Sequence, residues 1–404
     1  MENLKFTAPC LFGVESIAAG ELERMDIKNV RAENGRVSFE GDFNTLARAN
    51  ICSRYLERIC INVGEFEAVS FEELFQGVKS LPWENFIGKN DAFPVSGHSI
   101  KSALTSIPAC QKIVNKALAD RLGAAYGLKW LPQDSGVTYA VEFFLLKDRA
   151  MLLIDTSGAA LHKRGYRPHA NAAPLRETLA AAMVLSARPR EDVLIWDPFC
   201  GSGTIAIEAA MILTNRAPGL NRTFAAEQFA RLPVPMWEAA REAARAAIKT
   251  ESSCEVWASD LDEEALDLTY ENALRAGVEE YLNIFSADAR QIEKPDRRGT
   301  ILCNPPYGER LMTPEEVEQL YREMGQHFAG FDPWQIYVLT SHEGFEKLYG
   351  RRADKIRKLY NGMIPCYLYQ FFKPAAARQN EARTGYKKGN EHHGKPNQNK
   401  RRYR

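Results

Sequence analysis

A glycine-rich turn between an expected strand and an expected helix restricts the fold of this chain more than any other feature. Residues 193–196 form a short apolar run that predicts a buried strand, and residues 205–210 predict a helix. Between them, Asp197 to Thr204 read Asp-Pro-Phe-Cys-Gly-Ser-Gly-Thr. A strand, a glycine turn and a helix in this order are typical of the opening of a nucleotide-binding α/β unit, in which glycines let the backbone approach a ligand closely.

The chemistry of this turn indicates what it binds. No Lys-Ser or Lys-Thr pair follows it, so the turn differs from a phosphate-cradling P-loop. The carboxylate of Asp197 is instead suited to the ammonium group of an amino-acid moiety, directly or through water. A Gly-x-Gly sequence alone is weak evidence, because an ordinary tight turn has the same composition.

Acidic residues follow two further expected strands, 254–258 and 283–287. Asp260 could accept hydrogen bonds from both ribose hydroxyls of an adenosine, and Asp288 could accept one from the adenine N6 amine. Each acid alone could be a helix cap, but three at successive strand ends favour an adenosine-containing ligand. The insertion of residues 215–250 separates Asp260 from the glycines by more than a dinucleotide unit allows, which disfavours a nicotinamide cofactor.

A proline-rich pentapeptide follows the next expected strand, 300–303. It consists of Asn304, Pro305, Pro306, Tyr307 and Gly308. Prolines stiffen a loop, so the Asn304 side-chain oxygen and the Pro305 carbonyl could together accept both hydrogens of a planar amine. This would direct the lone pair of the amine toward a methyl donor. Tyr307 offers a ring face on which a flipped base can stack.

In combination, these motifs resemble those of class I S-adenosylmethionine methyltransferases that act on amino groups. Residues 161–167, 173–180 and 216–222 narrow the resemblance to the THUMP-containing bacterial RNA methylases, which include 23S rRNA guanine-N2 methyltransferases. The resemblance covers nearly the whole chain, from Leu4 to Lys373.

This resemblance implies an α/β fold: a Rossmann-like, seven-stranded class I methyltransferase domain preceded by ferredoxin-like and THUMP α+β domains. The implied boundaries are 1–43 for the ferredoxin-like part, 44–156 for THUMP, 157–374 for the methyltransferase domain and 375–404 for a basic, disordered tail. The last strand, 366–372, would run antiparallel beside 335–340 and the stretch around Lys358.

The resemblance also implies roles for single residues. Asn304, Pro305, Pro306 and Tyr307 would hold the target base. S-adenosylmethionine would be bound by Asp197, Cys200, Gly201, Gly203, Asp260, Leu261, Asp288, Ala289 and Asn304.

The N-terminal third predicts an α/β module. Asn34-Gly35 suggests a hairpin, residues 109–122 a helix, and residues 137–146 and 151–155 two strands. Lysines on such a helix are more often a solvated face, but the resemblance makes them candidates for contacts with RNA. The candidate RNA-binding residues are Lys101, Ser102, Lys112 and Lys116.

Composition excludes some classes of protein. With 52 basic and 52 acidic residues, no global field indicates a nucleic-acid partner, although the end of the chain is locally basic. That tail is either a solubilising segment or an arm for RNA phosphates. The eight cysteines show no metal or disulfide spacing, and no signal peptide or membrane span is evident. We therefore expect a cytoplasmic protein with RNA as its partner, without a metal and away from membranes.

Three other functions remain open at this point. The first is guanine-N2 methylation of tRNA rather than 23S rRNA. The second is adenine-N6 methylation of DNA, which uses a similar Asn-Pro-Pro-Tyr loop, although a THUMP-like module is unneeded on duplex DNA. The third is a non-catalytic RNA-binding assembly factor, which the intact acids and Asn304 disfavour.

Overall fold

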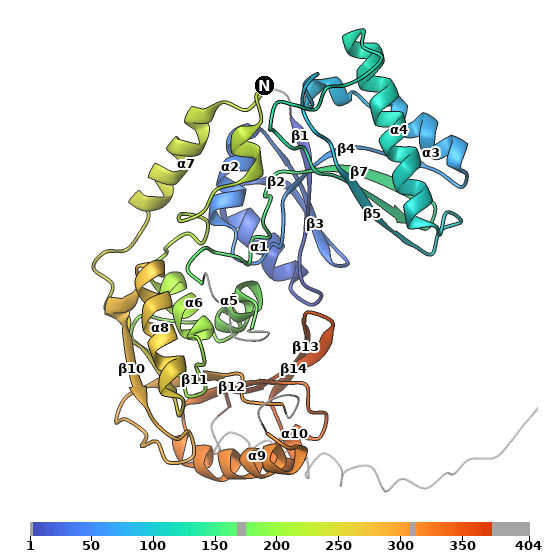
Figure 1. The fold of residues 1–404 in the computed structure, drawn as a ribbon. Helices are drawn as coiled ribbons and strands as arrows, with labels where there is room; N and C mark the ends of the chain where they lie inside the picture. Colours follow the sequence, from blue (N-terminus) through green and yellow to red (C-terminus); the bar gives the residue numbers. More distant parts are fainter. Residues whose placement is uncertain (1–2, 168–174, 308–311, 374–404) are drawn as a thin grey trace, which may run out of the picture.

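The structure, a computed structural model, describes residues 3–167, 175–307 and 312–373. Its strands form two seven-stranded sheets, one in each half of the chain. Figure 1 shows the N-terminal sheet and its helices above the C-terminal sheet. The described residues do not include residues 173–174, Gly308 or the basic tail.

The N-terminal sheet has the strand order β2-β3-β1-β4-β7-β6-β5. Its strands are β1 (Leu4–Pro9), β2 (Lys28–Glu33), β3 (Arg36–Gly41), β4 (Cys60–Glu67), β5 (Val95–Ile100), β6 (Val141–Leu146) and β7 (Arg149–Asp155). The helices are α1 (Glu15–Arg24), α2 (Phe43–Cys52), α3 (Phe71–Ser80) and α4 (Ile107–Tyr126), with the short η1 (Trp83–Asn85). Because β1 pairs with both β3 and β4, one continuous sheet joins the first and second parts of this half.

Several predicted elements are confirmed in this half, with changed ends. The expected hairpin is the β2–β3 turn, where Gly35 has φ +71°. The helix expected at 109–122 is the longer α4, which ends where Gly127 adopts a left-handed conformation with φ +67°. The strand expected at 137–146 was too long, because Thr138 forms only an isolated bridge to Ala92 and β6 begins at Val141.

The C-terminal sheet has the strand order β10-β9-β8-β11-β12-β14-β13. Its strands are β8 (Leu194–Asp197), β9 (Val256–Asp260), β10 (Leu282–Ser286), β11 (Gly299–Cys303), β12 (Gln335–Thr340), β13 (Lys355–Asn361) and β14 (Ile364–Phe371). The helices are α5 (Glu177–Ser186), α6 (Thr204–Leu213), α7 (Val234–Ala246), α8 (Glu263–Ala276), α9 (Pro314–Phe328) and α10 (Phe345–Tyr349), with the short η2 (Ala225–Gln228), η3 (Glu279–Tyr281) and η4 (Ala329–Phe331).

This arrangement confirms the predicted seven-stranded class I topology. The strands β10, β9, β8, β11 and β12 are parallel, and β14 runs antiparallel between β12 and β13. In Figure 1, α5, α6 and α8 lie on one face of this sheet and α9 and α10 on the other. Cover on both faces explains why every residue of β8 and β11 is buried.

The insertion at 215–250 contacts the N-terminal half and helps to hold the two halves together. Helix α7 packs against α2 of the N-terminal half, as Figure 1 also shows. The Gly219 amide donates a hydrogen bond to the Ile51 carbonyl at 2.8 Å, and the Ala226 amide donates one to Thr156 at 3.0 Å. The insertion therefore belongs to the interface between the halves.

Arg164, in the linker between the halves, is buried at the same junction. Its Nε lies 3.2 Å from the Glu208 carboxylate on α6. Its Nη2 donates to the carbonyl of Arg54 in the N-terminal half, and its Nη1 donates to that of Leu161 in the linker. One guanidinium thus joins three parts of the chain.

We expect Glu208→Ala to lower the free energy of unfolding by about 3–5 kcal/mol, because it would leave the Arg164 charge buried without a carboxylate. The measurement is urea unfolding followed by tryptophan fluorescence. The double variant Arg164→Met/Glu208→Leu should recover most of the loss, since it removes both charges. A single variant as stable as the parent would contradict a structural role for this pair.

Candidate functional site

The carboxyl ends of four parallel strands bring the predicted site residues to one edge of the C-terminal sheet. Asp197 ends β8, Asp260 ends β9, and Asn304 directly follows β11. The strands pair in register, with Asp197 beside Ala258 and Ser286 beside Asp260. Ligands of open α/β sheets bind at this edge.

The glycine loop after β8 is held by side chains of the neighbouring strand and helix. The Gly201 amide donates to the Asp260 carboxylate at 2.9 Å, and the Gly201 carbonyl accepts from the Thr269 hydroxyl at 2.7 Å. Asn272 donates to the Ser202 carbonyl at 3.0 Å. Gly203 has φ +81°, and a Cβ there would lie 2.7 Å from a Thr269 methyl group, so this position requires glycine.

Two predicted cofactor residues in this loop differ in their surroundings. Cys200 is buried, and its amide donates to the Ser259 carbonyl at 3.0 Å. A Cβ at Gly201 would meet no atom within 4 Å, which leaves open space on that side of the loop. A ligand can therefore approach the backbone at Gly201.

Asp197 is a buried carboxylate, and only one of its two oxygens accepts a hydrogen bond from a described residue. It is 1% exposed, and its Oδ1 accepts the Phe199 amide at 3.1 Å. Its Oδ2 is buried and has no partner among the described residues. Burial raises the pKa of Asp197 well above its ordinary value, and the nearby Asp260 charge raises it further. A cationic donor, such as the ammonium group of an amino acid, would supply the missing partner.

The carboxylates of Asp260 and Asp288 already have hydrogen-bonding or ionic partners in the protein. Besides accepting the Gly201 amide, Asp260 accepts that of Asp262 at 3.2 Å. The Asp288 carboxylate is paired with Arg290 at 2.6 Å, and this pairing lowers its pKa. An adenine amine at Asp288 would have to share that carboxylate. The adjacent predicted positions contrast in exposure, since Leu261 is exposed and Ala289 is buried.

The first and last residues of the Asn-Pro-Pro-Tyr loop are hydrogen-bonded to each other. The Tyr307 hydroxyl donates to the Asn304 side-chain oxygen, so the expected amine acceptor has an internal donor. The Tyr307 ring packs against the core, and burial raises the pKa of its hydroxyl well above the ordinary value. This differs from the expectation of a ring face free for stacking.

The two prolines of this loop sit at its base. Pro305 is buried and Pro306 half-buried. The Pro306 carbonyl accepts a hydrogen bond from the Tyr321 hydroxyl at 2.8 Å, which also contacts the Thr340 hydroxyl at 2.8 Å. Helix α9 and strand β12 therefore fix the loop from behind.

Sequence reasoning missed the side chains that support the site. Arg167 donates to the Thr204 hydroxyl at the start of α6 at 2.8 Å and pairs with Glu177 on α5 at 2.8 Å. Thr269 and Asn272 are three residues apart on α8, a spacing that puts both on the face toward the glycine loop. The sequence contains this spacing, but it indicates a contact with the glycine loop only when α8 is known to lie beside that loop.

The predicted RNA contacts lie in the N-terminal half. Lys112 and Lys116 are exposed one turn apart on α4, and the Lys116 ammonium lies 5.7 Å from the centroid of the Phe75 ring. Lys101 is exposed, with φ +51°. Ser102 has a local structural role, since its hydroxyl donates to Ile100 and accepts the Asp148 amide.

The described residues contain no group of three or more His, Cys, Asp or Glu side chains arranged to hold a metal ion. Across the same residues, none of the helices combines the length and apolar character needed to cross a membrane.

Family profiles match three consecutive parts of the chain. Residues 5–60 match the RlmL ferredoxin-like domain, and residues 68–155 match the THUMP domain. Residues 164–370, half of the chain, match the RMKL-like methyltransferase domain.

Two curated relatives cover nearly the whole chain. "Putative RNA methyltransferase YpsC" of Bacillus subtilis is 42% identical over 92% of this chain and 97% of its own length. "Ribosomal RNA large subunit methyltransferase K/L" of Psychromonas ingrahamii is 31% identical over 91% of this chain. The chain spans only 50% of that longer relative.

Two solved structures are similar in fold and sequence. One, from Listeria monocytogenes, is described as a "predicted N6-adenine-specific DNA methylase"; it is 41% identical, with a TM-score of 0.88 over 93% of this chain and 97% of its own. The other, SMU.472, is described as "a putative methyltransferase complexed with SAH"; it is 38% identical, with a TM-score of 0.87 over 92% of this chain and 98% of its own.

We expect Asp197→Asn to raise the thermal midpoint at pH 8 by at least about 2–4 °C, which corresponds to about 1 kcal/mol for a domain of this size. Because burial raises the pKa of Asp197, the stability associated with its protonated form is fully present below about pH 4 and is lost as pH rises through the folded-state pKa. Asparagine stays neutral and can still accept the Phe199 amide. The measurement is thermal unfolding at several pH values.

The matched control is Asp267→Asn, which neutralises an exposed carboxylate on α8. It should leave the pH dependence of the parent unchanged. If Asp197→Asn has the same thermal midpoint as the parent at every pH, the buried Asp197 carboxylate does not destabilise the parent.

Proposed function

The chain belongs to the RMKL-like methyltransferase family with ferredoxin-like and THUMP domains, and on that basis we propose that it methylates guanine N2 in 23S rRNA with S-adenosylmethionine as the methyl donor. The observation that carries the donor assignment is the unpartnered, buried Oδ2 of Asp197 beside an open glycine loop. A solved relative in complex with SAH supports the same donor. When bound, S-adenosylmethionine supplies an activated methyl group.

Different residues of this chain would contact different parts of the donor. Asp197 would accept a hydrogen bond from the ammonium group, and Asp260 would accept from the ribose. The backbone at Gly201 and Gly203 leaves room for the methionine part, and Ala289 would border the adenine. The buried position of Asp197 strengthens its attraction for a cation, because water competes less there.

The Asn-Pro-Pro-Tyr loop would hold the target amine. Asn304 presents its side-chain oxygen to a hydroxyl donor from Tyr307, and an N–H of the base amine could take the same position. The Pro305 carbonyl would accept the second N–H. With both hydrogens held, the nitrogen lone pair would be directed toward the methyl group and would be less delocalised into the π system of the base.

RNA as substrate is supported by the THUMP domain and by the names of both curated relatives. The large-subunit rRNA target is taken from the name of the relative of which this chain spans 50%. The description of a solved relative as an adenine-specific DNA methylase favours a second candidate, N6 methylation of DNA.

Methyl transfer from labelled S-adenosylmethionine to unmodified 23S rRNA, tRNA and genomic DNA tests these alternatives. Digestion and mass spectrometry of the product would identify the modified base. We expect N2-methylguanine in 23S rRNA. Label in DNA as N6-methyladenine, or in tRNA alone, would contradict the proposal.

We expect Asn304→Ala to lower turnover at least ~10²-fold while donor affinity stays within a few-fold, because alignment of a reacting atom is worth about this much. Single-turnover methylation and calorimetric titration of the donor separate the two effects. Tyr307→Phe is the matched variant, since it removes only the internal donor to Asn304. An equal loss in both variants would mean that Asn304 acts by holding Tyr307.

We expect Lys112→Glu/Lys116→Glu to weaken RNA binding and to flatten its dependence on log salt by about 1–2, as the loss of about two phosphate contacts requires. Donor affinity should not change, because these lysines lie on α4 of the N-terminal half. Fluorescence anisotropy across a salt series is the measurement. If the variant keeps the RNA affinity and the salt dependence of the parent, this face of α4 does not contact RNA and is only solvated.

A further inference from the structure

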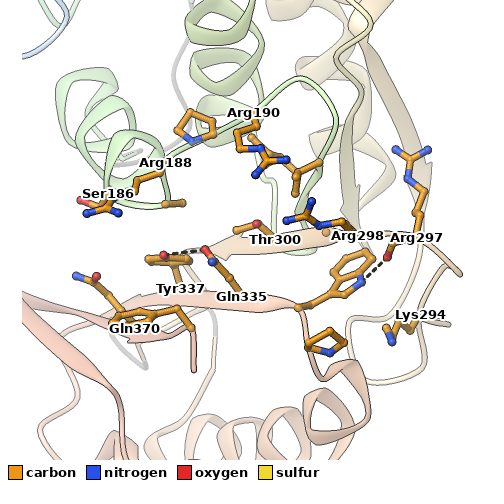
Figure 2. A pocket seen from close by; sticks show the side chains of 18 of the residues that line it. Ser186, Arg188, Arg190, Lys294, Arg297, Arg298, Thr300, Gln335, Tyr337 and Gln370 are labelled. Atoms are coloured by element: carbon orange, nitrogen blue, oxygen red, sulfur yellow. Dashed lines mark hydrogen bonds between the residues drawn. The ribbon is translucent and has the colours of Figure 1, made fainter. Parts of the chain in front are cut away.

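A cavity of about 700 Å³ lies at the opposite edge of the C-terminal sheet from the proposed donor site. We name it the amino-edge cavity, because β11 and β12 begin there, at Gly299 and Gln335. The loops after α5 and before β11 form its walls, as Figure 2 shows. A five-residue strand spans about 17 Å, so this cavity is separate from the site at the carboxyl edge.

Basic side chains dominate the lining of the amino-edge cavity. One acidic residue, Asp296, also lines it. The six basic residues are Arg188, Arg190, Lys294, Arg297, Arg298 and Lys355. Figure 2 shows Arg188 and Arg190 on one wall and Arg297, Arg298 and Lys294 toward another.

Part of this charge is already balanced. Asp192 pairs with Arg190 and lies 3.7 Å from Arg298, while Glu255 pairs with Arg297 at 2.8 Å. The Lys294 ammonium donates to the Asp332 carbonyl at 3.1 Å. Among the described residues, Arg188 and Lys355 have no carboxylate within salt-bridge distance. These two exposed cations are free to bind an incoming anion.

Buried polar side chains face the amino-edge cavity from its floor. Gln370 is 4% exposed and Thr300 is 6% exposed, and both line the cavity. Neither side chain makes a hydrogen bond with another described residue. Neither residue contributes a fully buried polar atom that lacks a partner, so the Gln370 amide and the Thr300 hydroxyl are accessible from the cavity. Both groups can therefore donate a hydrogen bond to a ligand that supplies acceptors.

We propose that the amino-edge cavity binds phosphate groups of the RNA substrate. Arginine and lysine are the side chains that most often contact phosphate oxygens, and the Gln370 amide and Thr300 hydroxyl can donate to the same group. Phosphate contacts position RNA without reading its sequence. This inference rests on the proposed function and adds a second place where the methyltransferase domain holds its substrate.

The sequence beyond the cavity favours RNA over a free nucleotide as the source of phosphate. Phe372 lines the cavity, and the described chain ends at the next residue. Residues 374–404 then contain nine lysines and arginines and two glutamates. A sequence this basic, directly after a residue that lines the cavity, favours a long polyanion over a single nucleotide.

The test is charge reversal of the two unpaired cations, Arg188→Glu/Lys355→Glu, in the full chain. We expect affinity for a 23S rRNA transcript to fall about 10-fold or more and the slope against log salt to flatten by about 1–2. The matched control, Arg245→Glu/Lys347→Glu, makes the same change in net charge at exposed positions outside the lining. Titration with S-adenosylmethionine should give parental affinity for both variants.

Equal RNA affinity and slope in the two variants would overturn the inference. A loss confined to AMP or inorganic pyrophosphate binding, with RNA binding unchanged, would also overturn it and assign the cavity to a free nucleotide or phosphate. Failure of the proposed function is distinguishable, because it would appear as salt-dependent RNA binding by the parent without methyl transfer.

Discussion

The buried pair of Arg164 and Glu208 is the interaction on which the arrangement of the halves depends. Glu208 belongs to α6, the helix that starts at the glycine loop, while Arg164 also holds the carbonyl of Arg54 in the N-terminal half. The helix behind the donor site is therefore tied to the half that carries the THUMP domain. Because removing one partner of a buried pair leaves an uncompensated charge, this junction resists separation. This junction therefore sets the distance between the THUMP domain and the proposed donor site.

A second guanidinium fixes the path of the linker. Arg222 in the insertion donates to the carbonyls of Ser157, Ala160 and Lys163. Burial lowers the pKa of Arg222 to about 10, since carbonyls compensate its charge less fully than a carboxylate would. The insertion therefore orders the linker that carries Arg164. Residues 215–250 thus have a structural role, whereas the sequence indicated only that they separate Asp260 from the glycines and that residues 216–222 support the family resemblance.

The parallel topology and the place of the site could be predicted from sequence, because strand periodicity and residues at strand ends are local signals. Asp197, Asp260 and Asn304 do meet at one edge. The pairing of Asp288 with Arg290 and the inward Tyr307 ring could not be predicted, since they depend on side-chain rotamers and on packing across the sheet. The amino-edge cavity was also beyond reach. Its cations come from three segments between Arg188 and Lys355, and no single motif contains them.

The charges at the two edges of the sheet explain why an RNA methyltransferase would need grips away from its chemistry. The carboxylates of Asp197 and Asp260 lie at the carboxyl edge, which suits a cationic donor and is unfavourable for phosphates, while the charge of Asp288 is balanced by Arg290. Screening reduces interactions beyond about 8–10 Å, so the repulsion is local, and cations placed about 17 Å away can attract the backbone without neutralising the donor site. The amino-edge cavity meets this condition. A balanced net charge over the whole chain is then compatible with RNA binding, because attraction and catalysis occupy different surfaces.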